Sequence, residues 1–465
     1  MTHLPTDLSH RLAKHGQEHL LTGWDQLAPH LKEAFVEELA GIDFAELEAL
    51  YQRKNESVAA LPTRDRIAPL HVEPAEAAVK TRPLGEAALR AGEVAVLMVA
   101  GGQGTRLGFD KPKGMFPVGP VSGASLFQMH AEKVMALSRR YGRSVPFLVM
   151  TSPATHDETE AYFKEHQFFG LPPDRVWFFQ QGTMPALDLN TGKLLLEAPG
   201  KLFLSPNGHG GTLTALADTG LLRQLTDEGV KHLFYFQVDN PLVYLAEPGF
   251  VGLHIHKGSE VSSKVVYKEV PEEKVGVLAQ IDGHCGIIEY SDMPAEMTQE
   301  RAADGTLAFR AGNPAIHIFS VPFLERVTSG EHRLAFHVAR KKVPHYDAAT
   351  SSTLTPTTEN ALKFELFVFD ALPLADRWLA LQTLREDEFA PLKNATGNDS
   401  PETCQRLQVD RARRWLTAAG VEVPLDATGV SQHPLEIGSL FALDAEELAS
   451  KIPANFRINE PVVLR

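Results

Sequence analysis

The sequence predicts an α/β fold built on a doubly wound, mainly parallel sheet. Short apolar runs rich in β-forming residues alternate with stretches of helical periodicity, and this alternation implies right-handed crossovers between parallel strands. The predicted strands are 94–100, 146–151, 176–179 and 233–238, and the predicted helical stretches between them are 126–141, 155–166 and 212–225.

Antiparallel strands are predicted in the second half of the chain. Residues 275–281 and 286–290 flank Asp282-Gly283, a dipeptide typical of tight hairpin turns. Residues 315–321 have the composition of one more core strand. We therefore expect a mixed sheet, in which antiparallel strands extend the parallel part.

The regions before and after this alternation differ from it. Apolar residues recur at helical spacing over 20–51, which predicts two or three amphipathic helices, and the proline-containing stretch 61–83 indicates a linker or strap. From about residue 376 the pattern is less regular. We predict a helical N-terminal region with its strap over 1–90, a central domain over 91–375 and a small C-terminal domain over 376–465.

Composition and charge exclude several classes of protein. The 465 residues are 43% hydrophobic and 22% charged, as in ordinary globular proteins, and the net charge of −14 argues against a nucleic-acid partner. The two cysteines, Cys285 and Cys404, are too few for a disulfide scaffold or a cysteine-based zinc site. The longest apolar run, 94–100, is far shorter than the roughly 20 residues of a membrane span. We expect a cytoplasmic protein without a membrane partner.

A glycine-rich segment follows the first predicted strand. Glycines at 101, 102, 104 and 108 let backbone N–H groups approach phosphate oxygens closely, although a tight turn alone would also explain them. The segment is neither a Walker loop nor the dinucleotide fingerprint, since Leu107 stands where the third glycine should be. Three cations that accompany these glycines repel one another unless anions are bound, which favours a polyphosphate site: Arg106, Lys111 and Lys113.

Two further segments carry chemistry. Residues 205–216 form a second glycine turn that opens a helix, and His209 within it is a candidate ligand contact or a structural residue. Residues 235–243 end a strand in Asp239-Asn240, beyond which ligands bind in open α/β sheets. A carboxylate beside a triphosphate is a natural Mg²⁺ ligand, and the alternative is that Asp239 caps a turn.

These segments, in this order, resemble the eukaryotic-type UDP-sugar pyrophosphorylases (uridylyltransferases), most closely the UDP-N-acetylhexosamine pyrophosphorylases. The similarity covers about residues 97–440. The matching motifs are Gly-Gly-Gln-Gly-Thr-Arg-Leu-Gly at 101–108, Pro112-Lys113-Gly114, and the segments 178–182, 238–240, 275–277, 338–342, 367–370, 385–394 and 434–437.

The resemblance implies a Rossmann-like central domain of the nucleotide-sugar transferase type, and a reaction of UTP with a sugar 1-phosphate. It implies that Arg106, Lys113 and Lys393 balance the phosphate charge and that Asp239 holds Mg²⁺. The residues implied to bind the nucleotide are Gly101, Gly102, Gly104, Gln181 and Gly208. The residues implied to bind the sugar are His209, Gly276, Glu289, Asn313 and Phe367, with Phe369 beside the last and both phenylalanines equally plausible as core residues.

One departure bears on the sugar. The acetylhexosamine enzymes usually read Asp-Gly-Asn-Gly-Gly in the second glycine loop, whereas this chain reads Asn-Gly-His-Gly-Gly at 207–211. Gly-His-Gly is the pattern of UDP-glucose and broad UDP-sugar pyrophosphorylases, so glucose 1-phosphate is the alternative substrate. A non-catalytic nucleotide-sugar sensor is an alternative of another class, and the retained cations at 106, 113 and 393 argue against it. The sequence makes no prediction of the oligomeric state.

Overall fold

The computed structural model describes residues 4–55, 61–329, 334–347 and 350–465. Two compact units make up the chain. The large unit comprises residues 62–180, 212–333 and 369–465, and the small unit comprises residues 1–61, 181–211 and 334–368. Both units are discontinuous, unlike the three consecutive regions predicted from the sequence.

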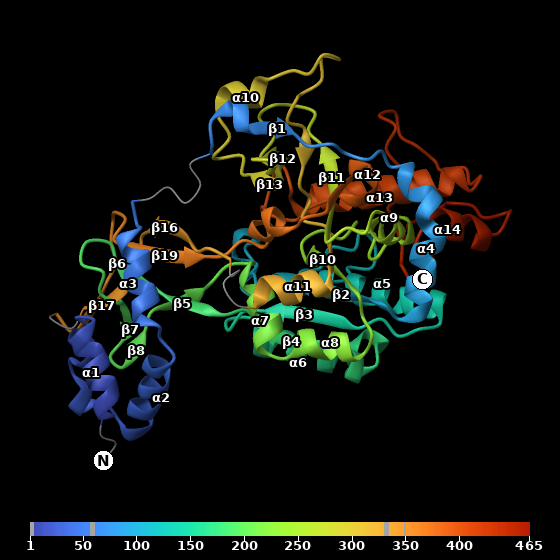
Figure 1. The fold of residues 1–465 in the computed structure, drawn as a ribbon. Helices are drawn as coiled ribbons and strands as arrows, with labels where there is room; N and C mark the ends of the chain where they lie inside the picture. Colours follow the sequence, from blue (N-terminus) through green and yellow to red (C-terminus); the bar gives the residue numbers. More distant parts are fainter. Residues whose placement is uncertain (1–3, 56–60, 330–333, 348–349) are drawn as a thin grey trace. The chain divides into compact units, whose positions relative to one another are not determined.

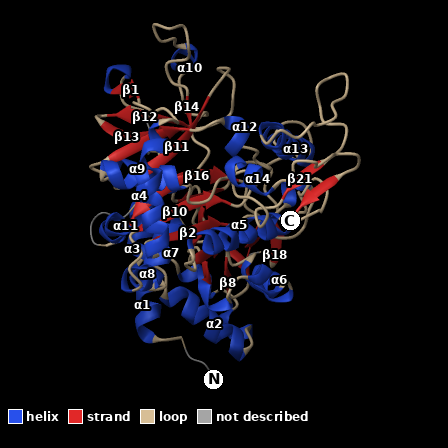
Figure 2. Cartoon of the chain, turned by 90° about the vertical axis from the view of Figure 1, so that its right-hand side faces the viewer, coloured by secondary structure: helices blue, strands red, loops and turns tan. Residues whose placement is uncertain are grey.

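The large unit is built on one mixed sheet, shown in Figures 1 and 2, which confirms the predicted α/β class. Its main path runs β1-β12-β14-β11-β15-β10-β2-β3-β4, with β13 beside β12 and β20 beside β11. Strands β10, β2, β3 and β4 are mutually parallel, and the strands beyond β10 add antiparallel pairs. The bounds are β1 Ile67–Pro69, β2 Val94–Val99, β3 Phe147–Thr151, β4 Val176–Gln180, β10 His232–Gln237, β11 Val261–Tyr267, β12 Val277–Ile281, β13 His284–Ile288, β14 Ala311–Gly312, β15 His317–Ser320 and β20 Trp378–Gln382.

Helices join these strands largely where the sequence predicts them. The hairpin β12–β13 turns at Asp282-Gly283, and both residues have the positive φ that a type I′ turn requires. The predicted helical stretch 212–225 forms two helices, because Gly220 takes the left-handed conformation between them. The helices of the large unit are α4 Ala77–Ala91, α5 Leu126–Tyr141, α6 His156–Glu165, α7 Gly211–Asp218 (which begins at the last residue of the small unit), α8 Leu221–Asp227, α9 Pro248–Lys257, α10 Ala295–Gln299, α11 Val321–Thr328, α12 Arg385–Glu388, α13 Pro401–Ala418 and α14 Ala445–Lys451.

The predicted strap over 61–83 is only partly extended. Its first half contains β1, which pairs with β12, but its second half is the start of helix α4, with Pro83 inside the helix. Helix α4 packs closely along α9, and a Cβ placed on Gly85 would lie 1.8 Å from the carbonyl oxygen of Pro248. The prediction was wrong for residues 77–83, because tertiary packing of this helix pair outweighs the cost of an internal proline.

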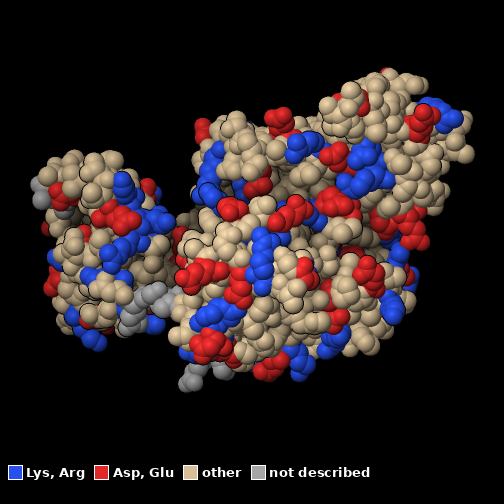
Figure 3. Space-filling model, turned by 90° about the horizontal axis from the view of Figure 1, so that it is seen from above, with Lys and Arg blue, Asp and Glu red and all other residues tan. Residues whose placement is uncertain are grey.

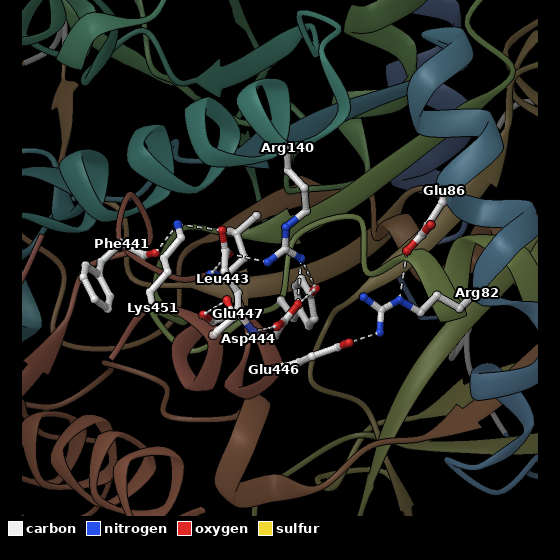
Figure 4. Close-up of polar contacts among 11 residues, drawn as sticks. Arg82, Glu86, Arg140, Phe441, Leu443, Asp444, Glu446, Glu447 and Lys451 are labelled. Atoms are coloured by element: carbon white, nitrogen blue, oxygen red, sulfur yellow. Dashed lines mark hydrogen bonds and ion pairs between the residues drawn. The ribbon is translucent and has the colours of Figure 1, made fainter. Parts of the chain in front are cut away.

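The C-terminal region of the large unit packs on α5 through ion pairs (Figure 4). The guanidinium of Arg140, near the end of α5, lies 2.6 Å from Asp444, the residue that caps α14, and also pairs with Glu447. Arg82 of α4 reaches Glu446 at 2.7 Å. Strands β21 Leu435–Ile437 and β22 Val462–Leu464 are parallel to each other, and β21 packs against α13. Strand β20 belongs to the main sheet, although it follows the predicted boundary at residue 375.

The small unit has its own core of leucine and phenylalanine side chains. The predicted N-terminal helices are present, and α1, which the sequence pattern did not predict, precedes them. The helices are α1 Thr6–Lys14, α2 Pro29–Ala40 and α3 Phe44–Gln52. The strands are β5 Thr183–Pro185, β6 Leu187–Asp188, β7 Leu196–Ala198, β8 Lys201–Leu202, β9 Leu204–Pro206, β16 His337–Lys341, β17 His345–Asp347, β18 Ser352–Leu354 and β19 Ala361–Glu365.

The surface is charged and mixed. On the face seen in Figure 3, lysine and arginine side chains are interspersed with aspartate and glutamate. Across the described ranges, no helix combines the length and the apolar character that crossing a membrane requires.

Candidate functional site

The glycine loop begins at the carboxyl end of β2, and hydrogen bonds between its own backbone groups hold its shape. The backbone N–H of Lys113 donates to the carbonyl oxygen of Gly102 at 3.0 Å, and that of Gly104 donates to Lys111 at 2.9 Å. A Cβ on Gly104 would lie 2.7 Å from the carbonyl oxygen of Phe109, so this glycine is needed for the loop itself. A Cβ on Gly102 would have no described protein atom within 4 Å, which leaves this backbone open to a ligand.

Lys113 and Asp239 meet beyond adjacent parallel strands. Strand β10 pairs with β2 in a register that places Gln237 opposite Val99, so the glycine loop and Asp239 leave the same edge of the sheet. The Lys113 ammonium lies 3.5 Å from the Asp239 carboxylate, and their side chains are 18% and 13% exposed. Arg106, on the short helix Thr105–Leu107, is exposed and pairs with no carboxylate in the described part of the chain.

A third segment, residues 388–393, joins this pair. The Lys113 ammonium donates to the carbonyl oxygen of Leu392 at 3.2 Å, and the backbone N–H of Leu392 donates to the carbonyl oxygen of Asp239 at 2.9 Å. The structure therefore brings together three stretches that are far apart in the sequence: the glycine loop, the end of β10 and the segment that carries Lys393.

Lys393 faces a cavity of about 690 Å³ within the large unit. The cavity is lined by residues that follow β11, by the segment 385–399 and by α13. Two arginines that the sequence interpretation left out, Arg385 and Arg406, also line it. Asp399 lies there too, and burial raises the pKa of its carboxyl while the Lys393 charge opposes that effect. Arg385 precedes the acidic run 386–388, and because such runs usually mark solvated surface, the sequence pattern contains no signal for a cavity here.

Three of the predicted sugar-binding residues lie together beside this cavity. The backbone N–H of Asn313 donates to the carbonyl oxygen of Gly276 at 2.8 Å, and a Cβ on Gly276 would lie 2.9 Å from the Glu289 carboxylate. Burial raises the pKa of Glu289, Asp292 raises it further, and the nearby Lys393 charge lowers it. Gly276, Glu289 and Asn313 therefore form one polar group within electrostatic reach of Lys393.

A second set of predicted residues lies within the small unit. The backbone N–H of Asn207 donates to the carbonyl oxygen of Gly182 at 3.0 Å, which places Gln181, 8% exposed, next to the second glycine loop. Gly208 has φ of +84° and packs so tightly that a Cβ would lie 2.5 Å from the Leu366 carbonyl oxygen. Only glycine fits both the conformation and the space.

The backbone and side chains that directly follow β19 hold His209 in place. Its Nδ1 accepts a hydrogen bond from the backbone N–H of Val368 at 3.2 Å, and its ring lies 5.3 Å from that of Phe367. Phe367 also contacts the ring of His337 at 4.6 Å. His209 therefore has a structural role in the small unit.

The acidic run 386–388 is solvated only in part, although such runs usually mark surface. Glu388 is 5% exposed rather than solvated, and its carboxylate pairs with Lys264, whose side chain is fully buried. Burial lowers the pKa of Lys264, but the carboxylates of Glu247 and Glu388 outweigh that effect and raise it above its usual value. A buried lysine is rare unless it is paired, and the sequence pattern gave no sign of its partner.

The chain is similar over most of its length to known proteins. Residues 46–411 match the family described as UTP–glucose-1-phosphate uridylyltransferase. The human UDP-N-acetylhexosamine pyrophosphorylase-like protein 1 is 40% identical over 91% of this chain and 87% of that protein. The UDP-N-acetylglucosamine diphosphorylase 2 of Arabidopsis thaliana is 35% identical over 92% of this chain and 89% of that protein.

A solved structure agrees with these sequence comparisons. The uridine diphosphate N-acetylglucosamine pyrophosphorylase from Trypanosoma brucei, solved in complex with an inhibitor, is 28% identical and has a TM-score of 0.82. The similarity covers 100% of this chain and 99% of that one. Together with the sheet whose glycine loop, Asp239 and Lys393 segment converge at one edge, these similarities show that the chain belongs to the UTP–glucose-1-phosphate uridylyltransferase family and is a nucleotidyltransferase that makes a UDP-sugar.

Proposed function

We propose that the chain makes a UDP-N-acetylhexosamine and pyrophosphate from UTP and an N-acetylhexosamine 1-phosphate. The observation that carries the proposal is the contact of Lys113 with both Asp239 and Leu392, which joins the phosphate loop to the segment of Lys393. The names of the human and Arabidopsis relatives support an N-acetylated sugar.

The roles of the residues follow from charge. UTP and a sugar 1-phosphate carry about six negative charges together, and two unit charges 4 Å apart repel by about 4 kcal/mol at a surface-like dielectric. Lys113 and Lys393 would reduce this repulsion from within the large unit, with Arg106 adding charge from the surface of the loop. The backbone N–H groups of Gly101 and Gly102, in the loop that Gly104 shapes, would donate hydrogen bonds to phosphate oxygens.

The reaction needs no protein nucleophile. A phosphate oxygen of the sugar 1-phosphate attacks the α-phosphorus of UTP, the new P–O bond forms, and the bond to the bridging oxygen breaks to release pyrophosphate. Such transfers depend on positioning and on electrostatic stabilisation, which the lysines and the loop amides provide. Because one phosphoanhydride replaces another, we expect the reaction to be reversible.

We assign Mg²⁺ to Asp239. Within the described ranges no group of three or more His, Cys, Asp or Glu side chains could hold a metal ion, so a protein-only cage is not part of this proposal. Mg²⁺ commonly binds one or two carboxylates together with substrate phosphates, and a single carboxylate beside the phosphate loop fits that donor set. When bound, it would add positive charge at the phosphate oxygens.

Gln181 and Gly208 are proposed to recognise uracil, since the small unit brings their backbones together. Gly276, Glu289 and Asn313 are proposed to bind the sugar, and their closeness to Lys393 supports this role. His209 and Phe367 are proposed as further sugar contacts. The Gly-His-Gly pattern around His209 favours glucose 1-phosphate as a second candidate substrate.

Pyrophosphate release with UTP and separate sugar 1-phosphates tests the proposal. We expect the highest kcat/KM with an N-acetylhexosamine 1-phosphate, and a preference for glucose 1-phosphate would assign the chain to the second candidate. Lys113→Ala should lower kcat roughly 100-fold while changing sugar affinity little, because its charge acts on the reacting phosphates. Near-wild-type turnover in Lys113→Ala would remove that residue from the reaction.

A further inference from the structure

One side chain joins the carboxyl end of β10 to the segment 388–393. Asn240 is 4% exposed, and its amide nitrogen donates to the carbonyl oxygen of Glu388 at 2.7 Å. Its amide oxygen accepts a hydrogen bond from the backbone N–H of Ala390 at 3.1 Å. The side chain thus pairs with the segment as a neighbouring strand would, through one donor and one acceptor.

The backbone continues this pairing toward Lys393. Leu392 donates to the Asp239 carbonyl oxygen at 2.9 Å, and Lys393 and Asn394 both donate to the carbonyl oxygen of Asp399, at 2.7 and 3.0 Å. Only two residues separate Ala390 from Lys393. The bonds of Asn240 to Glu388 and Ala390 and of Leu392 to Asp239 therefore form one continuous pairing that leads to Lys393.

The start of the segment is anchored on its other side. The Glu388 carboxylate pairs with buried Lys264 of β11 and accepts a hydrogen bond from the backbone N–H of Tyr244 at 3.2 Å. Lys264 also lies 2.5 Å from the Glu247 carboxylate. With the Glu388 carboxylate fixed by these charges, the amide of Asn240 holds the backbone at Glu388 and Ala390, where the Ala390 carbonyl oxygen also accepts a hydrogen bond from the Cys404 thiol at 3.1 Å.

We propose that Asn240 is a positioning residue, which holds Lys393 in register with Asp239 by bonding both Glu388 and Ala390. The inference rests on the phosphate role proposed for Lys393. Asn240 itself touches no reacting atom in this scheme. Without its amide, the Glu388 carbonyl and the Ala390 N–H lose their partners in a buried place, and the segment must shift to satisfy them.

A double-mutant cycle between Asn240 and Lys393 tests this role. A misplacement of about 1 Å can lower turnover roughly 100-fold, so Asn240→Ala should lower kcat by about that factor with little change in the Kd of UTP. In the Lys393→Ala background, the same substitution should lower kcat less than about 3-fold, because that variant has no ammonium group left for Asn240 to position. Equal losses in both backgrounds would overturn the proposal.

Asn360 provides a matched control in the small unit. Its amide also makes one donor and one acceptor bond to backbone, both to Val343, at 3.0 and 2.8 Å. Asn360→Ala should cost stability but show no coupling to Lys393→Ala. Coupling of the same size would show that the cycle reports general destabilisation, and would overturn the proposal.

A second variant distinguishes loss of positioning from loss of folding. Asn240→Ser keeps a polar group that is too short to bond both Glu388 and Ala390, so it should reproduce the low kcat with a cooperative unfolding transition. Loss of that transition in both Asn240 variants would assign the residue to stability and overturn its positioning role. Wild-type activity in Lys393→Ala alone would instead contradict the proposed function, independently of Asn240.

Discussion

At the scale of single residues, the large unit brings an acid and a cation together where phosphate is expected. Asp239 and Lys113 are 3.5 Å apart, longer than a strong ion pair and with both side chains mostly buried. A carboxylate so placed can exchange the ammonium for a metal ion when phosphate arrives to take up the lysine charge. Lys113 would then contact the phosphates directly, and Asp239 would hold the metal ion that binds them.

Asp239→Asn tests this arrangement while keeping the size of the side chain. We expect Mg²⁺ to strengthen UTP binding to the wild type but not to the variant, measured by calorimetric titration with and without the metal. Losing the metal's charge stabilisation should lower kcat/KM roughly 100-fold, which corresponds to about 3 kcal/mol of transition-state free energy. Lys113→Ala is the control, since it should keep the metal effect on binding. An unchanged metal titration in Asp239→Asn would remove Asp239 from the metal site.

Local patterns predicted these residues, but the contacts that position them were beyond sequence reasoning. The glycine loop and Asp239 follow strands that the apolar runs reveal, and the carboxyl ends of adjacent parallel strands necessarily meet. The bond between Asn240 and Ala390 joins residues 150 positions apart and depends on the orientation of one amide. Likewise, an acidic run usually marks surface, and only the fold shows that Glu388 is buried with Lys264.

At the scale of elements, the pair α4–α9 shows how close packing decides the structure of a stretch that reads as a linker. Gly85 of α4 meets Pro248 and Gly252 of α9, and Gly249 and Gly252 of α9 meet the backbone of α4. The Thr81 hydroxyl donates to the Gly249 carbonyl oxygen at 3.0 Å. These glycines allow the two helix backbones to come into contact, whereas in the sequence alone glycine indicates a break in a helix.

Gly85→Ala should therefore destabilise the protein, although alanine is the better helix former by about 1 kcal/mol. The added methyl would lie 1.8 Å from the Pro248 carbonyl oxygen, and forcing the helices apart costs roughly 1–3 kcal/mol or more. Chemical denaturation monitored by circular dichroism gives the change in unfolding free energy. Ala87→Gly, at an exposed position of α4, should lose only about 1 kcal/mol. A stabilised Gly85→Ala variant would contradict the tight packing of this pair.

At the scale of the whole molecule, stability is linked to pH through histidines that fold in the neutral form. His254 of α9 is 1% exposed, its Nδ1 is 2.7 Å from the Ser262 hydroxyl, and its ring lies 5.0 Å from that of His232. Burial, with a smaller contribution from His232, lowers the pKa of His254 to about 3. Burial also lowers the pKa of His232 to about 4. Both rings are therefore neutral in the folded protein at neutral pH.

The unfolding free energy should fall as the pH is lowered from 7 to 5. In this range an unfolded histidine, with a pKa near 6.5, binds a proton that folded His254 does not, so acid favours the unfolded chain. The contribution of His254 is fully present above pH 6.5 and is lost as the pH falls toward 3, by about 2 kcal/mol at pH 5. Denaturant unfolding at pH 7 and pH 5 measures it. His254→Gln should remove about 2 kcal/mol of the pH dependence. The same pH dependence in wild type and His254→Gln would mean that His254 is protonated in the folded protein.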